Sequence, residues 1–138
     1  MKRVICPERV RRIEGSLGWV DHRFITGGFL RDLTSIEILL YFFLAVVGDR
    51  DGVSFYRDDR IVSLLKIDLV SLGKARQGLI ERSLIAYESP LYQVLSLPPE
   101  PVNLPSREER ERKGQEIAHY YLQKIREILQ GKEGLRGV

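Results

Sequence analysis

The sequence predicts a mainly α-helical protein with a small β-hairpin, and three observations predict it. First, apolar residues recur at helical spacing in three segments, at about 36–47, 59–65 and 69–82, and in the second half of a fourth, 106–131. Second, a residue that can cap a helix with its side-chain oxygen precedes each segment: Thr34, Asp58, Asp68 and Ser106. Third, two stretches rich in β-forming residues, 84–87 and 91–96, flank Glu88-Ser89-Pro90, as hairpin strands flank a turn.

Length and composition indicate a globular protein with one domain and an appendage. The 138 residues fit one domain, and 43% hydrophobic and 30% charged residues are ordinary for such a protein. Lys and Arg number 22 against 19 Asp and Glu, so the net charge of +3 permits an anionic partner without requiring one. Cys6 is the only cysteine, which excludes an internal disulfide and a thiolate zinc site and fits a reducing cytoplasm.

Hydropathy gives no indication of a membrane segment. The longest apolar run, 38–47, is far shorter than the roughly 20 residues that a membrane-spanning helix needs. The basic residues within 1–14 are not followed by the apolar core of a signal peptide. We therefore expect a soluble, cytoplasmic protein that does not interact with membranes.

Residues 1–18 form a basic N-terminal arm. Five basic and two acidic residues give this segment a net charge of +3, and Pro7, Gly15 and Gly18 interrupt any regular structure. The arm is either a solvated tail or a segment that follows a phosphate backbone. The next segment, 19–30, predicts short pieces that pack their apolar groups onto the domain: Trp19, Phe24, Ile25, Phe29 and Leu30.

The first long helix begins at a capping box. The Thr34 hydroxyl can accept from the third helical N–H, while the Glu37 carboxylate can accept from the Thr34 N–H. We expect Gly48 to end this helix in the left-handed conformation. Because the helix is apolar nearly all round, it is either the central core helix or presents one face to a partner. After a turn at 49–52, residues 53–56 predict a short strand.

Two shorter helices joined by a tight turn come next. Asp58 is expected to cap a helix over about 59–65, and Asp68 a helix over about 69–82. We expect Lys66 to adopt the left-handed conformation in the turn, at a cost on the order of 1 kcal/mol. The inward residues of the later helix are predicted to be Leu69, Leu72, Ala75, Leu79 and Ile80.

A connector and a final helix complete the chain. Residues 98–105 contain four prolines and predict a stiff connector without helix or strand. Ser106 to Glu109 is a second capping box, so we expect a helix over 106–131 that Gly131 ends, followed by a frayed tail over 132–138. The second half of this helix has one broad apolar face: Ile117, Ala118, Tyr121, Leu122, Ile125, Ile128 and Leu129. The face either forms the seam of a homodimer or packs on the protein's own domain.

The order helix, strand, helix, tight turn, helix, hairpin over residues 34–97 resembles that of winged helix-turn-helix DNA-binding proteins. Ile61–Asp68 shows the alternation of apolar, small, turn and capping residues that is typical of helix-turn-helix sequences, although Lys66 stands where many members have glycine. The likeness extends loosely to MarR-type regulators, and to the N-terminal domains of plasmid and phage replication initiators and DnaD-like proteins. The resemblance implies a winged helix-turn-helix domain over 19–97 plus a C-terminal helix.

The resemblance further implies a protein that binds double-stranded DNA and reads the major groove with the 69–82 helix. Such a protein would be a transcription regulator or a replication or mobile-element accessory factor, and a homodimer through the C-terminal helix would match palindromic half-sites. Ser71 and Lys74 suit phosphates or base edges, and Gln77 suits adenine. The full set of expected DNA-binding residues is Ser71, Lys74, Gln77, Arg76, Arg57 and Lys66.

Two features favour an alternative, a winged-helix protein–protein interaction adaptor that does not bind DNA. The wing turn Glu88-Ser89-Pro90 has no basic residue to grip a phosphate, and the 36–47 helix is apolar nearly all round. We expect no enzyme activity, cofactor or metal. His22 and His119 lie far apart with no metal-ligand spacing around them, and Cys6 has no acid–base partner nearby in the sequence.

Overall fold

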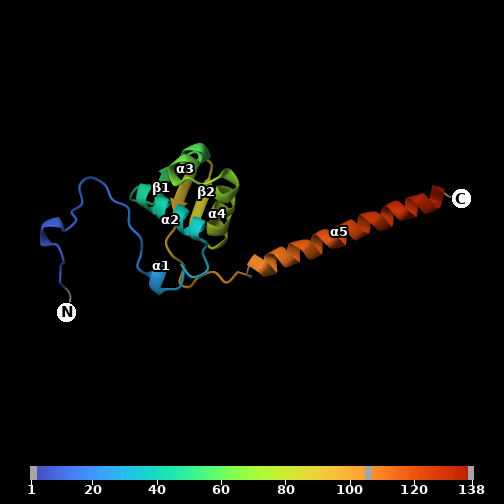
Figure 1. Ribbon diagram of the computed structural model, residues 1–138, viewed down its shortest axis with the longest axis horizontal. Helices are drawn as coiled ribbons and strands as arrows, with labels where there is room; N and C mark the ends of the chain where they lie inside the picture. Colours follow the sequence, from blue (N-terminus) through green and yellow to red (C-terminus); the bar gives the residue numbers. More distant parts are fainter. Residues whose placement is uncertain (1–2, 105–106, 137–138) are drawn as a thin grey trace. The chain divides into compact units, whose positions relative to one another are not determined.

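A computed structural model describes residues 3–104 and 107–136, and the chain divides into two compact units, Met1–Val102 and Asn103–Val138 (Figure 1). The elements of the first unit are η1 (Pro7–Arg9), α1 (Arg23–Thr26), α2 (Ser35–Val47), β1 (Val53–Phe55), α3 (Asp58–Leu65), α4 (Leu69–Glu81), β2 (Ile85–Glu88) and β3 (Leu91–Val94). The second unit contains α5 (Arg107–Arg136). The predicted class, mainly α with a β-hairpin, is confirmed at this level.

The hairpin belongs to a sheet of three antiparallel strands in the order β1-β3-β2. β3 is the central strand because β1 pairs with its other edge, which places Phe55 opposite Leu91. β3 ends at Val94, two residues earlier than the sequence indicates. Tyr92 of this strand is only 1% exposed, so the middle of the sheet closes the core.

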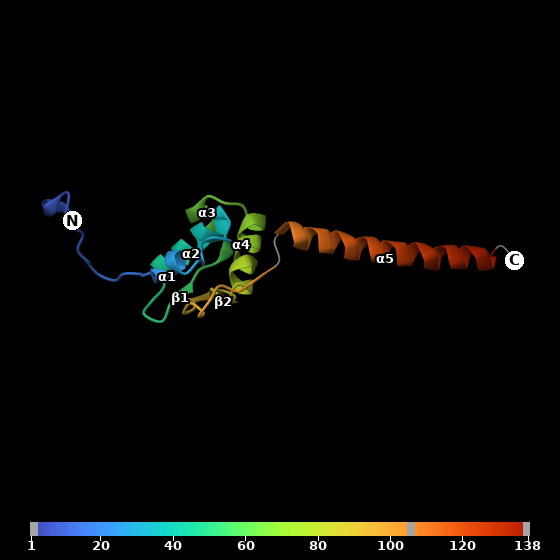
Figure 2. The same cartoon turned by 90° about the horizontal axis from the view of Figure 1, so that it is seen from below.

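The core of the first unit lies where α2 and α4 pack against each other and against the sheet. In Figure 2 the strands lie along one side of this unit and α3 along the opposite side, with α2 and α4 between them. Its most deeply buried aliphatic side chains are Leu40, Leu44, Ile61, Leu72, Leu79, Leu84 and Ile85. α2 is thus a central core helix, although Phe42 and Val46 on its outer face remain exposed.

Two of the expected helix boundaries are confirmed in their capping details. Thr34 and Glu37 form the reciprocal capping box at the start of α2. Asp68 caps α4 by accepting from the Ser71 N–H at 3.0 Å. Lys66 adopts the left-handed conformation, with φ 57° and ψ 46°, in the turn between α3 and α4. The sequence therefore predicts this turn correctly despite the absence of glycine.

Two other boundaries differ from the prediction. α3 begins at Asp58 itself and its N-cap is Arg57, because the Asp58 carboxylate lies in the first helical turn and pairs with Arg76. Gly48 is extended, with φ −66° and ψ 146°, and not left-handed. The chain leaves α2 in this conformation because Asp49 organises the following turn, where its carboxylate accepts from the N–H groups of Asp51 and Val53.

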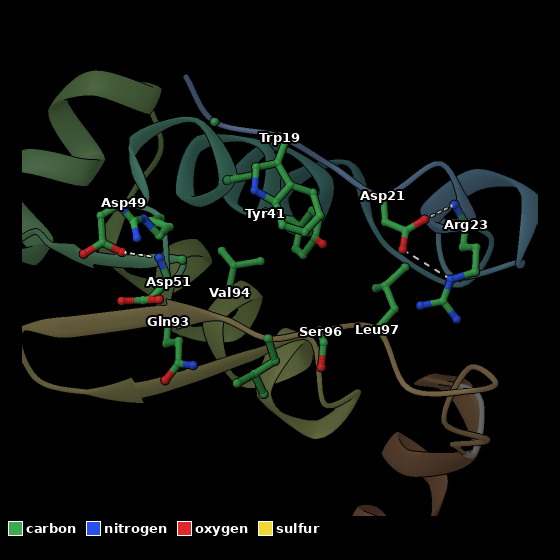
Figure 3. Close-up of a pocket in the computed structure, with 15 residues that line it drawn as sticks. Trp19, Asp21, Arg23, Tyr41, Asp49, Asp51, Gln93, Val94, Ser96 and Leu97 are labelled. Atoms are coloured by element: carbon green, nitrogen blue, oxygen red, sulfur yellow. Dashed lines mark hydrogen bonds and ion pairs between the residues drawn. The ribbon is translucent and has the colours of Figure 1, made fainter. Parts of the chain in front are cut away.

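The segment before α2 is only partly packed on the core. Phe24 and Phe29 are buried, and the Phe24 ring stacks on Tyr41 at 4.4 Å between centroids. Trp19 and Ile25, which the sequence analysis places on the domain, are 69% and 70% exposed. Figure 3 shows Trp19 above Tyr41, at the outside of α2. That expectation is wrong because the core position beside Tyr41 is taken by Phe24.

The second unit is a single long helix. α5 passes through Gly131 and continues to Arg136, so the predicted end of the helix at Gly131 is wrong, as is the described part, 132–136, of the predicted frayed tail. One glycine inside a helix costs only about 1 kcal/mol, which the surrounding helix formers offset. Ser106, the expected cap, lies outside the described residues, and so do 105, 137 and 138. Among the residues that the structure describes, no helix has both the length and the apolar character that crossing a membrane requires.

Candidate functional site

The turn between α3 and α4 presents the beginning of α4 on the surface of the first unit. The Ile67 N–H donates to the Val62 carbonyl at 3.3 Å, which closes the turn tightly behind Lys66. Leu69 and Val70, the first two residues of α4, are 60% and 65% exposed. Leu69 was expected to point inward, and its exposure corrects the predicted apolar stripe. The buried stripe of α4 starts at Leu72, which is completely buried.

Four of the six predicted DNA-binding residues have exposed side chains: Arg57, Lys66, Lys74 and Gln77. Lys74 and Gln77 lie one turn apart on α4, and Lys66 lies in the turn that precedes this helix. Gln77 donates from Nε2 to Glu81 Oε1 at 3.4 Å, a contact that water can replace because both groups lie near solvent. These four side chains are free to meet a partner at the surface.

Ser71, the fifth predicted residue, takes part in the cap of its own helix. Its hydroxyl donates to Asp68 Oδ1 at 2.5 Å and its N–H donates to Oδ2. The hydroxyl hydrogen bond, followed by the one from the Ser71 backbone, lowers the pKa of the Asp68 carboxyl. Because this pKa is lower than in the unfolded chain, the cap contributes to stability above the ordinary pKa and is lost as the pH falls. Asp68 is therefore ionised at neutral pH.

Arg76, the sixth predicted residue, joins three elements of the fold. Nη1 donates to Asp58 Oδ1 of α3 and to the Tyr92 hydroxyl of β3, both at 2.8 Å. The guanidinium also lies 4.3 Å from the centre of the Tyr87 ring on β2. Partial burial alone would lower the pKa of Arg76, but the bonds to Asp58 and Tyr92 outweigh it and raise that pKa. Only 17% of the side chain is exposed, so its partners are intramolecular.

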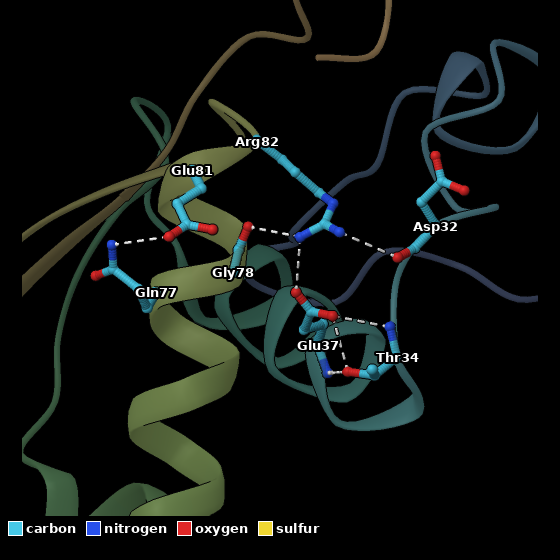
Figure 4. A network of polar contacts seen from close by, with 7 residues as sticks. All are labelled: Asp32, Thr34, Glu37, Gln77, Gly78, Glu81 and Arg82. Atoms are coloured by element: carbon cyan, nitrogen blue, oxygen red, sulfur yellow. Dashed lines mark hydrogen bonds and ion pairs between the residues drawn. The ribbon is translucent and has the colours of Figure 1, made fainter. Parts of the chain in front are cut away.

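A second buried network links α2 to the end of α4, and sequence reasoning missed it (Figure 4). Glu37 is completely buried, and its Oε2 accepts from Arg82 Nη1 at 3.2 Å. Arg82 also donates to the carbonyls of Gly78 and Asp32. Gly78 and Arg82 both face Glu37, because a Cβ on residue 78 would meet the Glu37 carboxylate that Arg82 binds. The available signal was that Glu37 is the only charged residue in α2, where burial requires a partner.

A cavity of about 360 Å³ lies on the side of the first unit formed by residues 18–23, α2, the turn 49–52 and residues 93–97 (Figure 3). Trp19 and Tyr41 provide its aromatic wall, and Asp21 pairs with Arg23 at its rim at 3.2 Å. The backbone hydrogen bond from Arg23 lowers the pKa of Asp21. The described residues contain no group of His, Cys, Asp or Glu that could hold a metal ion. Nothing in the sequence pattern indicates this cavity, because its walls come from four separate segments.

Comparisons with known proteins found no relative of this chain. A scan against protein-family models, a search of curated proteins and a search of solved structures each found no match. Any function must therefore be argued from the geometry and charge of the chain itself.

Proposed function

We propose that this chain is a winged helix-turn-helix protein that binds double-stranded DNA and reads the major groove with α4. The observation that carries the proposal is the tight left-handed turn at Lys66, which joins α3 to an α4 whose first residues are exposed. The hairpin β2–β3 follows α4 directly and occupies the place of a wing. A helix presented in this way has the 10–12 Å diameter that the major groove admits.

A small excess of exposed positive charge on α3, α4 and the turn between them supports the same proposal. Arg76 and Arg82 are engaged inside the protein, so the exposed cations of α3, α4 and their turn are Arg57, Arg60, Lys66 and Lys74. Asp59 and Asp68 are the exposed anions of these segments, which leaves four minus two, or +2. Over residues 3–18 the arm adds four exposed cations, Arg3, Arg9, Arg11 and Arg12, against two exposed anions, Glu8 and Glu14, or +2 more. Binding to phosphates through so few contacts predicts weak affinity with a clear dependence on salt.

We expect the substitution Lys74→Ala to weaken duplex binding about tenfold at 0.1 M salt, because it removes a cation from the middle of the reading helix. The slope of log affinity against log salt should also become shallower by about 1. Fluorescence polarisation with a duplex selected from a random library measures both quantities. Arg31→Ala is the matched control, because Arg31 is exposed and precedes Asp32, which contacts the opposite end of α4.

The intact chain should bind duplex DNA at low salt. An absence of binding to random duplexes at low salt would overturn the proposal and favour the adaptor alternative, in which the exposed Phe42 and Val46 of α2 meet another protein. A regulator and a replication or mobile-element accessory factor make the same contacts with DNA, so the selected sequences and their genomic positions separate these two roles.

We further propose that two copies pair through α5. Six of the apolar residues of this helix are spaced symmetrically about Gln123: Ile117, Ala118, Tyr121, Ile125, Ile128 and Leu129. An antiparallel pair centred there places each of them against an apolar residue of the other copy. A parallel pair would instead bring both Glu111 carboxylates, one heptad before Ala118, into the seam. The five larger side chains of the set are each more than half exposed on the isolated helix, so they are available for such a pair.

We expect Ile125→Glu to raise the dissociation constant of the dimer at least tenfold, because it places two carboxylates in an apolar seam. Sedimentation equilibrium over a range of protein concentrations measures the effect. Gln123→Glu adds the same charge on the opposite side of the helix, and the dimer should tolerate it. If the wild-type chain is monomeric at high micromolar concentration, the proposed pairing through α5 is wrong.

A further inference from the structure

The first turns of α4 present aliphatic side chains where a reading helix usually presents polar ones. Leu69 and Val70 are mostly exposed, whereas the Ser71 hydroxyl is already donated to Asp68. Gly73 follows with open space where a side chain would stand. Before Lys74, the groups that α4 can present to a DNA base are therefore the aliphatic side chains of Leu69 and Val70 and the open backbone at Gly73. The Ser71 hydroxyl already has a partner within the protein.

Exposed aliphatic groups at this position have one apolar counterpart in the major groove. Of the four bases, only thymine presents a methyl group there, whereas the other edges are hydrogen-bond donors and acceptors. The charges around Leu69 and Val70 suit this contact. Lys66 precedes them and Lys74 follows them, so phosphates can be held on both sides of the apolar pair.

On the basis of the proposed DNA binding, we propose that Leu69 and Val70 recognise thymine C5-methyl groups, and that this contact gives the protein its sequence preference. Lys66 and Lys74 hold the backbone and contribute affinity without choosing a sequence. Gly73 allows α4 to lie close to the bases, because its position has no side chain that could meet the groove. The preferred sites accordingly contain thymines under the first turn of α4.

The test removes the methyl group alone. A selected duplex is compared with duplexes in which deoxyuridine replaces thymine at one position at a time. At the contacted positions, wild-type affinity should fall about fourfold for each methyl group, in keeping with the transfer of one buried carbon from water. Val70→Ala and Leu69→Ala should bind the thymine duplex more weakly, and they should no longer distinguish it from the deoxyuridine duplex at the position that each residue contacts.

Two controls separate a lost contact from a lost fold. Val46→Ala removes an aliphatic side chain of α2 that is 52% exposed, and it should keep the full preference for thymine. Circular dichroism melting should be unchanged in all three variants, because none of the side chains is buried. If the wild type binds both duplexes equally well at every position, the methyl recognition is wrong while DNA binding stands. If no duplex binds at low salt, the proposed function itself fails.

Discussion

Gly78→Ala should destabilise the first unit by about 2–4 kcal/mol, although alanine is the better helix former. A Cβ at residue 78 would collide with the Glu37 carboxylate, which is completely buried and is held by Arg82 and by the Thr34 N–H. Moving that carboxylate breaks its bond to Arg82, and loss of one side of a buried ion pair costs about 3–5 kcal/mol. The higher helix propensity of alanine offsets about 1 kcal/mol of this loss of stability. For a domain of about 100 residues, each kcal/mol lowers the melting temperature by roughly 4–8 °C, so we expect a fall of at least about 8 °C.

Gly73→Ala is the matched control for this prediction, because it lies on the same helix and a Cβ there meets nothing within 4 Å. We expect it to stabilise the protein by up to about 1 kcal/mol. Thermal and urea unfolding followed by circular dichroism measure both variants. If the two substitutions raise stability alike, the close packing of Gly78 against Glu37 is not a feature of the folded protein in solution.

The parts of the fold that the sequence predicts are those where one local signal decides the structure. The Thr34 and Glu37 capping box and the Asp68 cap each depend on residues three positions apart, and the turn at Lys66 depends on the single stretch 61–68. The order of helices and strands follows from hydrophobic periodicity in the same way. Boundaries are missed where a distant partner intervenes, as at Asp58, whose carboxylate is paired with Arg76 18 residues away.

The candidate site is predicted less well, because exposure of a charged side chain depends on partners that the sequence does not place. Lys74 and Gln77 are exposed as expected, whereas Arg76 lies on the same helix and is held by Tyr92 and Asp58. Helical periodicity puts Arg76 only at the margin of the outward face, and no local rule reveals that the Tyr92 hydroxyl reaches it. The inward-facing Gly78 is missed for the same reason, since Glu37 lies 41 positions before it in the sequence.

Arg82→Met should destabilise the protein by about 3–5 kcal/mol, because the Glu37 carboxylate then stays buried without its guanidinium partner. Glu37→Gln, which removes the other charge of the ion pair, should lower the free energy of unfolding by less. Glutamine can still accept from the Thr34 N–H in the capping box, and Arg82 keeps its bonds to the Gly78 and Asp32 carbonyls. The double variant Glu37→Gln/Arg82→Met removes both charges, and it should be more stable than Arg82→Met alone. Urea unfolding of the four proteins gives the coupling energy.

The Arg82→Met variant also decides whether the Arg82 guanidinium contacts DNA. If Arg82 acts only by joining α4 to α2, then DNA binding measured well below the melting temperature keeps the wild-type dependence on salt. Lys74→Ala, in contrast, should reduce that dependence by about one ion while leaving stability nearly unchanged. A shallower salt dependence in fully folded Arg82→Met would place Arg82 at the DNA, against its 12% exposure and its bond to Glu37. The two substitutions thus separate a residue that holds α4 in the fold from one that is proposed to contact the duplex.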